Sequence, residues 1–195
     1  MNIEWKMEIE MTAIDKFYIE DKVVIITGGA GLLGRKHAEA VIEGRGIPVL
    51  IDISNKALKE VMESLQHIYP EDRKMDGYIA DITKREEMEK VADQILNKYG
   101  HIDILINNAA NNPKVECKSE NMKAIQFENF PMQTWLDDLA VGLTGAFICA
   151  QVFGAIMAKQ QKGVILNISS DLGIIAPDQR IYRKDGLSDD EQTIK

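Results

Sequence analysis

The sequence predicts an α/β fold: a doubly wound parallel sheet with helices on both faces. Short apolar runs alternate with helical segments, and a glycine-rich turn joins the first run to the first helix. Runs that are apolar throughout are typical of parallel strands, because helices cover both sides of such a sheet. The alternation also implies right-handed crossovers between neighbouring parallel strands.

Five short runs, rich in β-branched residues, have the composition of buried strands. They are Val23–Thr27, Val49–Ile53, Tyr78–Ile82, Ile102–Ile106 and Val164–Ile168. We assign residues 21–195 to one domain, which is an ordinary domain size, and residues 1–20 to an N-terminal extension. Residues 171–195 hold no recognisable closing strand, so we expect the C-terminal strands of the sheet to be missing.

Helices are expected between these strands. They run from about Leu33 to Glu43, from a cap at Ser54 or Asn55 to Pro70, from a cap at Thr83 to Gly100, and from about Pro131 to Gln160. Glu86 follows Thr83 by three residues, which is the spacing of a capping box. The polar stretch from Asn111 to about Asn129 is typical of a loop.

Composition argues against several function classes. The net charge is −8, from 31 acidic and 23 basic residues, and such a surface repels nucleic acids and anionic membranes. Cys117 and Cys149 stand far apart without metal-ligand spacing, so we expect no metal site. The N-terminus lacks a secretory pattern, and no run reaches the roughly 18 uninterrupted apolar residues of a membrane span. We therefore expect a cytoplasmic protein.

The turn Thr27–Gly34, with the sequence TGGAGLLG, carries the strongest functional signal. Its glycines permit positive φ and a close approach to a pyrophosphate, and the helix that follows offers unpaired N–H groups. Gly34 is expected to let this helix pack closely on the strand. The residues expected to hold the cofactor are Thr27, Gly28, Gly31, Leu32, Leu33 and Gly34. A turn of this kind between a buried strand and a helix predicts a Rossmann-type domain that binds a nicotinamide dinucleotide.

Asp52 stands at the end of the second strand, 18 residues after Gly34. A carboxylate at this place accepts hydrogen bonds from the adenine ribose hydroxyls and repels a 2′-phosphate. Ile53, which we also place in the cofactor site, follows where an arginine would favour NADP, and the turn itself has no basic side chain. These features favour NAD over NADP. The alternative, in which Asp52 only caps its strand, stays open.

Five motifs in order resemble those of the short-chain dehydrogenase/reductase family. They are TGGAGLLG at residues 27–34, the strand-end Asp52, ADIT at 80–83, NNAA at 107–110 and NISS at 167–170. The resemblance covers the chain from about Phe17 to Pro177. The chain also resembles, more loosely, members that take part in surface-sugar or flagellin modification.

This resemblance implies a role for each matching position. It places Asp81 and Ile82 beside the adenine, and Asn107, Ala109, Ala110 and Ile168 along the cofactor. Asn107 is also implied to stabilise the sheet, and Ser170 matches the catalytic serine that hydrogen-bonds the substrate oxygen. The family pairs this serine with a tyrosine acid/base and a lysine four residues later. Packing of its long fourth helix implies a homodimer or homotetramer for the full-length protein.

The chain departs from the family pattern at three places. No Tyr-x-x-x-Lys follows Ser170, because the only tyrosine there is Tyr182 and residue 186 is glycine. We therefore expect an N-terminal portion that is inactive without this pair. Gly142 replaces the usual asparagine, which holds a water in the proton relay, and we expect either close packing or an altered site there. The usual pattern has a glycine two residues before the last glycine of the turn. Here Leu32 holds that place and Gly31 precedes it, which is the glycine spacing of extended family members.

Three functions stay open on this sequence. The leading one is an NAD-dependent oxidoreductase that interconverts an alcohol and a ketone on a small molecule, with a sugar or sugar nucleotide as the candidate substrate. The second is a dinucleotide-binding fragment or pseudo-enzyme without turnover, which the missing Tyr/Lys pair favours. The third, suggested by the glycine spacing, is a sugar-nucleotide epimerase or dehydratase.

Overall fold

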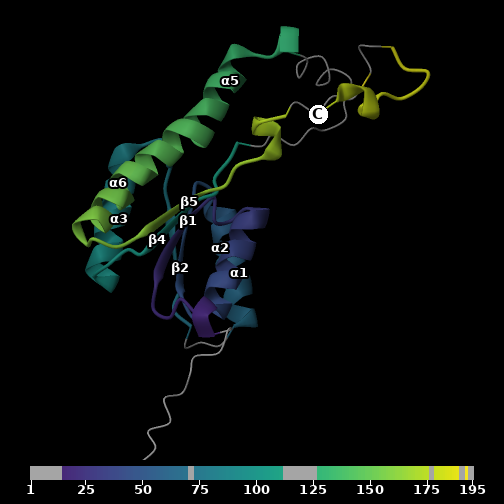
Figure 1. Ribbon diagram of the computed structural model, residues 1–195. Coiled ribbons are helices and arrows are strands. Elements are labelled where there is room, and N and C mark those ends of the chain that lie inside the picture. The colour runs from purple at the N-terminus through teal and green to yellow at the C-terminus, as the bar shows by residue number, and fades with distance from the viewer. Residues whose placement is uncertain (1–14, 70–72, 112–126, 176–177, 189–191, 193–195) are drawn as a thin grey trace, which may run out of the picture.

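A computed structural model describes residues 15–69, 73–111, 127–175, 178–188 and 192. Five parallel strands form one sheet in the order β3-β2-β1-β4-β5, and helices cover both of its faces (Figure 1). The strands are β1 (Val23–Thr27), β2 (Ile47–Asp52), β3 (Asp76–Ile79), β4 (Ile104–Asn107) and β5 (Val164–Asn167). The predicted Rossmann-type α/β fold is confirmed.

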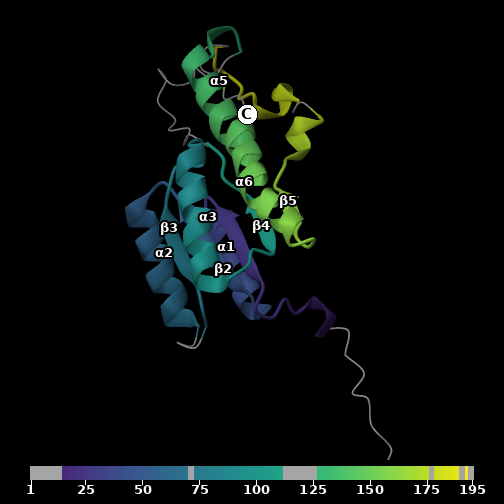
Figure 2. The same cartoon turned by 90° about the vertical axis from the view of Figure 1, so that its left-hand side faces the viewer.

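The helices lie in two layers, one on each face of the sheet. They are α1 (Leu32–Glu43), α2 (Asn55–Ile68), α3 (Arg85–Tyr99) and α6 (Ala146–Lys159), while α5 (Met132–Leu139), which has no buried residue, continues the line of α6 past the strands (Figure 1 and Figure 2). In Figure 1, α1 and α2 lie on one side of the strands and α3 and α6 on the other, and Figure 2 shows α3 running beside α6. This arrangement explains the uniformly apolar strands, because both faces of β1 are buried.

Alternate residues of β1 supply the two halves of the core. Val23 and Ile25 pack with α3 and α6, where Phe153 is fully buried. Val24 and Ile26 pack with α1 and α2, where Leu65 is fully buried. Each such side chain contributes roughly 1.5–3 kcal/mol on leaving water, so packing on both faces stabilises the sheet.

The start of β2 was predicted two residues too late, because Pro48 is unusual inside a strand. The Ile47 amide donates to the carbonyl of Lys22, so the next residue directs its nitrogen to the opposite side. On that side β3 pairs with β2 only from Val49 onward. Pro48 therefore lacks its N–H at a position where the sheet offers no acceptor from β3.

Other boundaries also differ from prediction by one or more residues. The third strand is Asp76–Ile79 rather than Tyr78–Ile82, the fourth is Ile104–Asn107 rather than Ile102–Ile106, and the fifth ends at Asn167. The first helix begins at Leu32, after an N-cap at Gly31. Of the two candidate caps for α2, the structure uses Ser54, whose hydroxyl accepts from the Ala57 amide at 3.3 Å.

The predicted capping box at Thr83 and Glu86 is wrong. Lys84 is the N-cap residue of α3, and its side chain makes no cap hydrogen bond. The Thr83 hydroxyl instead donates to Asp81 at 2.7 Å. Glu87, one residue beyond Glu86, accepts the Asp81 amide at 2.7 Å. The helix begins one residue later than predicted, so Thr83 lies before the N-cap position and its hydroxyl bonds Asp81.

The predicted long helix is continuous but not uniform. Between α5 and α6 the residues Ala140–Gly145 form a π-helix, which the sequence pattern did not show. A Cβ on Gly142 would meet nothing within 4 Å, so the expected close packing at this residue is wrong. Close packing occurs at Gly145, where a Cβ would lie 2.6 Å from the Ile82 side chain.

This helix, Met132–Lys159, is also the one described segment long and apolar enough for a membrane span. Its most apolar 18-residue window has a mean hydropathy of 1.9. In the sequence we searched for an uninterrupted apolar run. That criterion does not detect this helix, because polar residues interrupt its apolar run. Of that window 22% is buried, and Cys149, Phe153 and Met157 form the face of the helix that packs against the sheet and α3. Burial raises the pKa of the Cys149 thiol to about 12.

The strand β5 forms an exposed edge of the sheet. It pairs with β4, and all four of its residues are exposed, with Val164 at 60% and Leu166 at 46%. The described part of the following tail contains two short 3-10 helices, Asp171–Gly173 and Gln179–Tyr182, and no strand. An exposed parallel edge of this composition is an association hazard.

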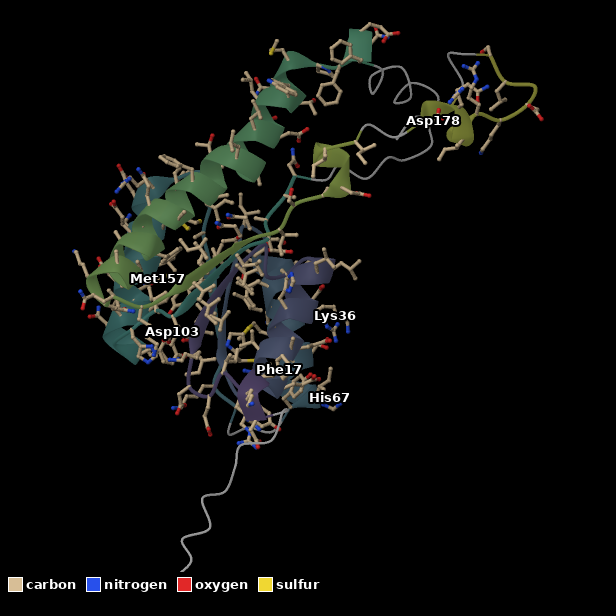
Figure 3. The ribbon with its side chains drawn as sticks, in the orientation of Figure 1. Phe17, Lys36, His67, Asp103, Met157 and Asp178 are labelled. Carbon is tan, nitrogen blue, oxygen red and sulfur yellow. The ribbon has the colours of Figure 1, made fainter. Side chains whose placement is uncertain are left out.

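Asp103 (labelled in Figure 3) joins the amino ends of two central strands. Its carboxylate accepts from the Val23 amide at 3.1 Å, from Lys22 Nζ at 3.0 Å and from His101 Nδ1 at 2.7 Å. The side chain is only 7% exposed. Burial by itself raises the pKa of Asp103, but the hydrogen bonds from Lys22, Val23 and His101 outweigh it and leave the pKa below its ordinary value.

We expect Asp103→Asn to lower the free energy of unfolding by about 2 kcal/mol at pH 7, because hydrogen bonds to a charged group contribute roughly 1.5–3 kcal/mol. A depressed folded-state pKa stabilises the fold above the unfolded value near 4 and loses that effect as pH falls through the folded value. The gap between wild type and variant should therefore narrow below pH 4 in urea unfolding. A gap that stays constant down to pH 3 would contradict this account. Asp178→Asn, at an exposed ion pair, is the control.

Candidate functional site

The carboxyl ends of four neighbouring strands bring polar residues to one edge of the sheet. Thr27 ends β1, Asp52 ends β2, Asn107 ends β4 and Asn167 ends β5. Asn107 stands directly opposite Asn167 in the parallel register. In open parallel sheets, ligands bind outside this edge where the strand order reverses, which here is between β1 and β4.

The glycine turn leaves the N-terminus of α1 open to a ligand. Gly28 has φ 62°, and its carbonyl accepts the Gly31 amide at 3.0 Å. Gly31 is the N-cap residue, and no side chain caps the helix. Leu32 is 83% exposed and Leu33 55% exposed. The first N–H groups of a helix lack intrahelical partners, so this end is a suitable site for an anion.

Close backbone packing holds the turn in shape. A Cβ on Gly34 would overlap the Gly28 carbonyl oxygen and lie 2.8 Å from Gly29 Cα. Gly34 therefore packs against the turn, whereas we expected it to pack on the strand. Gly29, which we did not predict as a site residue, faces β2, where a Cβ would lie 2.7 Å from Leu50 Cβ. A Cβ on Gly28 would lie 2.8 Å from Ala109 Cα.

Thr27 and Asn108 connect this turn to the end of β4. The Thr27 hydroxyl accepts the amides of Asn108 at 3.0 Å and Ala109 at 3.1 Å. The Asn108 side chain donates to the carbonyls of Thr27 at 3.0 Å and Gly28 at 3.3 Å. Asn108 was missing from the predicted site. The doubled asparagine of the NNAA stretch was the available signal for it.

The Asp52 carboxylate holds two backbone amides at the end of β2. Its Oδ2 accepts the Ala30 amide at 3.0 Å and its Oδ1 accepts the Ser54 amide at 2.9 Å. Asp52 thus caps its strand and fixes the glycine turn at the same time. Each carboxylate oxygen has a second acceptor direction, so a ribose hydroxyl can still bind. Ile53, beside it, is 71% exposed.

Asp81 and Ile82 lie in the turn between β3 and α3. The Ala80 amide donates to the Asp52 carbonyl at 3.0 Å, which brings this turn to the end of β2. Burial raises the pKa of Asp81, but the bonds from Thr83 and the charge of Lys84 outweigh it and hold the pKa below its usual value. Asp81 is therefore an anion near neutral pH.

Asn107 ties the last two strands together. Its Nδ2 donates to Asn167 Oδ1 at 2.8 Å and to the Ala146 carbonyl at 3.4 Å. This cross-strand bond fits the sheet-stabilising role that the resemblance implies. The ladder continues one residue further, since the Ile168 amide donates to the Asn107 carbonyl at 3.0 Å. Ala110 is exposed at the same edge of the sheet.

Ser170 follows β5 at the same edge and is exposed. Its hydroxyl donates to Asp171 Oδ1 at 3.1 Å. Tyr182 lies in a short 3-10 helix, and its side chain is outside the described side chains. Within the described ranges, no group of three His, Cys, Asp or Glu residues is placed to hold a metal ion.

Comparison with known proteins shows the family of this chain. A family model for short chain dehydrogenases matches residues 22–182. The chain belongs to the short-chain dehydrogenase family. The matched range includes the glycine turn, the asparagine pair at the end of β4 and Ser170.

Individual family members match over most of this chain. The NAD-dependent glycerol dehydrogenase of Listeria innocua is 33% identical over 165 residues, which are 85% of this chain and 59% of that protein. The post-translational flagellin modification protein A of Campylobacter coli is 25% identical over 82% of this chain and 59% of its own length. The structure of an NAD+-bound xylitol dehydrogenase aligns with TM-score 0.71 and 26% identity, over 83% of this chain and 57% of that one. The chain thus spans about three fifths of the length of these relatives.

Proposed function

We propose that this chain binds NAD, in preference to NADP, across the glycine turn and the ends of β1, β2 and β4. We further propose that the protein it represents is an oxidoreductase that interconverts an alcohol and a ketone on a small molecule. The named relatives include an NAD-dependent dehydrogenase and an NAD+-bound structure, which support a nicotinamide dinucleotide as the cofactor class.

One observation carries the cofactor proposal: the Asp52 carboxylate and the open end of α1 are joined by a single hydrogen bond, from the Ala30 amide. The turn therefore presents N–H groups for a pyrophosphate at a fixed distance from an acceptor for ribose hydroxyls. Gly28 and Gly34 let the turn pack closely on Ala109 and on itself, which holds the turn in the shape that would take a phosphate.

Each group then has a defined task in the proposed reaction. The nicotinamide supplies hydride chemistry when it is bound. Ser170 is exposed at the site edge, and its hydroxyl, which donates to Asp171 Oδ1 in this structure, would exchange that bond for one to the oxygen of an alcohol or ketone. Proton transfer at that oxygen needs an acid/base whose pKa lies nearer neutrality than the ordinary tyrosine value of about 10. Between Ser170 and Lys195 the sequence has no Tyr-x-x-x-Lys pair for this task.

The proposed substrate class rests on the named relatives. Named relatives act on glycerol, D-threitol and xylitol, and one takes part in flagellin modification, which supports a polyol, sugar or sugar nucleotide. We also propose a cytoplasmic homodimer or homotetramer that binds neither membrane nor nucleic acid, in keeping with the net charge of −8.

A second candidate function is binding of NAD without turnover, because residues 171–195 hold no Tyr-x-x-x-Lys. Determining the coding sequence beyond Lys195 distinguishes the two. We expect a Tyr-x-x-x-Lys segment within about 60 further residues, the scale of one more helix and its flanking strands. A reading frame that ends at Lys195 would instead leave a dinucleotide-binding protein without the acid/base.

A further inference from the structure

We infer that Glu87 is a positioning residue that sets the wall of the cofactor site next to the adenine. This inference rests on the proposed function, because it assumes that a dinucleotide lies against Asp81 and Ile82. Glu87 lies in the first turn of α3, on the helix side of the turn that carries these two residues.

The turn after β3 is fixed at three successive residues by different elements. The Ala80 amide donates to the Asp52 carbonyl at 3.0 Å, so β2 holds its start. The Asp81 amide donates to Glu87 Oε2 at 2.7 Å, so α3 holds its middle. Ile82 is nearly buried and packs against the π-helix, where Gly145 leaves room for it. Glu87 is the only one of these supports that comes from a side-chain hydrogen bond.

The bond from Asp81 to Glu87 is charge-assisted and short, which makes it one of the stronger hydrogen bonds in this region. Lys84 Nζ lies 3.2 Å from Glu87 Oε1 and 3.6 Å from Asp81 Oδ2. It therefore neutralises two carboxylates that would otherwise repel each other across the turn. Accepting the Asp81 amide, together with the charge of Lys84, lowers the pKa of Glu87, so it stays ionised at neutral pH.

The side chain and the backbone of Asp81 are therefore held by different residues. The Asp81 side chain is occupied by Thr83, through its amide at 2.9 Å and its hydroxyl at 2.7 Å. Glu87 instead orients the Asp81 backbone, and with it the direction in which Ile82 leaves the turn. Loss of Glu87 should disturb the adenine end of the site and leave the nicotinamide end, which is built on β4 and β5, unchanged.

The test measures the affinity of the full chain for NADH and for reduced nicotinamide mononucleotide, which lacks the adenosine half of NADH. In Glu87→Ala we expect NADH affinity to fall on the order of tenfold, the scale of one hydrogen bond to a charged group. Affinity for the mononucleotide should stay within twofold of wild type. Glu87→Gln, whose amide oxygen still accepts the Asp81 amide, should restore NADH binding.

Glu86→Ala is the matched control, because Glu86 is the exposed neighbour on the same helix turn and carries none of these bonds. NADH binding by Glu87→Ala within twofold of wild type would overturn the inference, as would an equal loss of both ligands. A folded wild-type chain that binds neither ligand would contradict the proposed function itself.

Discussion

Gly34→Ala should abolish measurable NADH binding, with the dissociation constant raised at least about 100-fold. The new Cβ would overlap the Gly28 carbonyl oxygen and press on Gly29 Cα, and both are backbone atoms that no rotamer change can move. Overpacking of this kind costs roughly 1–3 kcal/mol or more, and here it is relieved only by opening the phosphate cradle. Fluorescence titration with NADH measures the effect.

Helix propensity alone predicts that Gly34→Ala stabilises α1 and does no harm to the turn. Alanine is a better helix former than glycine by about 1 kcal/mol, and Gly34 lies in the first turn of α1. Gly142→Ala is the matched control, since its Cβ would meet nothing within 4 Å. That variant should bind NADH within twofold of wild type. Normal NADH binding by Gly34→Ala would show that the turn does not hold the phosphates.

Asp52→Ala should weaken NADH binding by about 10- to 100-fold while leaving NADPH binding unchanged or tighter. The carboxylate is expected to accept the ribose hydroxyls of NADH, and hydrogen bonds to charged groups contribute roughly 1.5–3 kcal/mol each. Toward NADPH the same carboxylate faces a phosphate, so its removal also relieves repulsion. Parallel titrations with the two reduced cofactors measure the ratio of the affinities.

The structural role of Asp52 calls for a second variant. Asp52 also holds the amides of Ala30 and Ser54, so its truncation can loosen the turn for any ligand. Asp52→Asn keeps a carbonyl acceptor but removes the charge. Its one acceptor oxygen can hold only one of these two amides, so it should unfold at a lower denaturant concentration than wild type, and it should lose most of the preference for NADH. Equal losses of affinity for NADH and for NADPH in both variants would remove the reason for choosing NAD.

The parts of the site that sequence could predict are those built from neighbouring residues. The run VVIIT and the turn that follows it are recognisable because strand burial and glycine conformation are local properties. Asp52 was placed correctly at a strand end although its strand begins earlier than predicted. Ser54 was among the expected caps for the same local reason.

The parts that sequence could not predict depend on which strands become neighbours. Asn108 bonds Thr27 and Gly28 across a gap of about 80 residues, which becomes visible only once β1 lies beside β4. Pro48 is acceptable in β2 only because β3 starts one residue later. The capping box failed for a different reason, because α3 begins after Lys84 and Thr83 is therefore not the N-cap residue.

The most direct test of the central claim is an NADH titration of the full chain, with circular dichroism to show that it is folded. The account predicts saturable enhancement of NADH fluorescence that NAD displaces and that Gly34→Ala eliminates. A flat titration with a folded chain would contradict the assignment of residues 27–34 and Asp52 as a dinucleotide site.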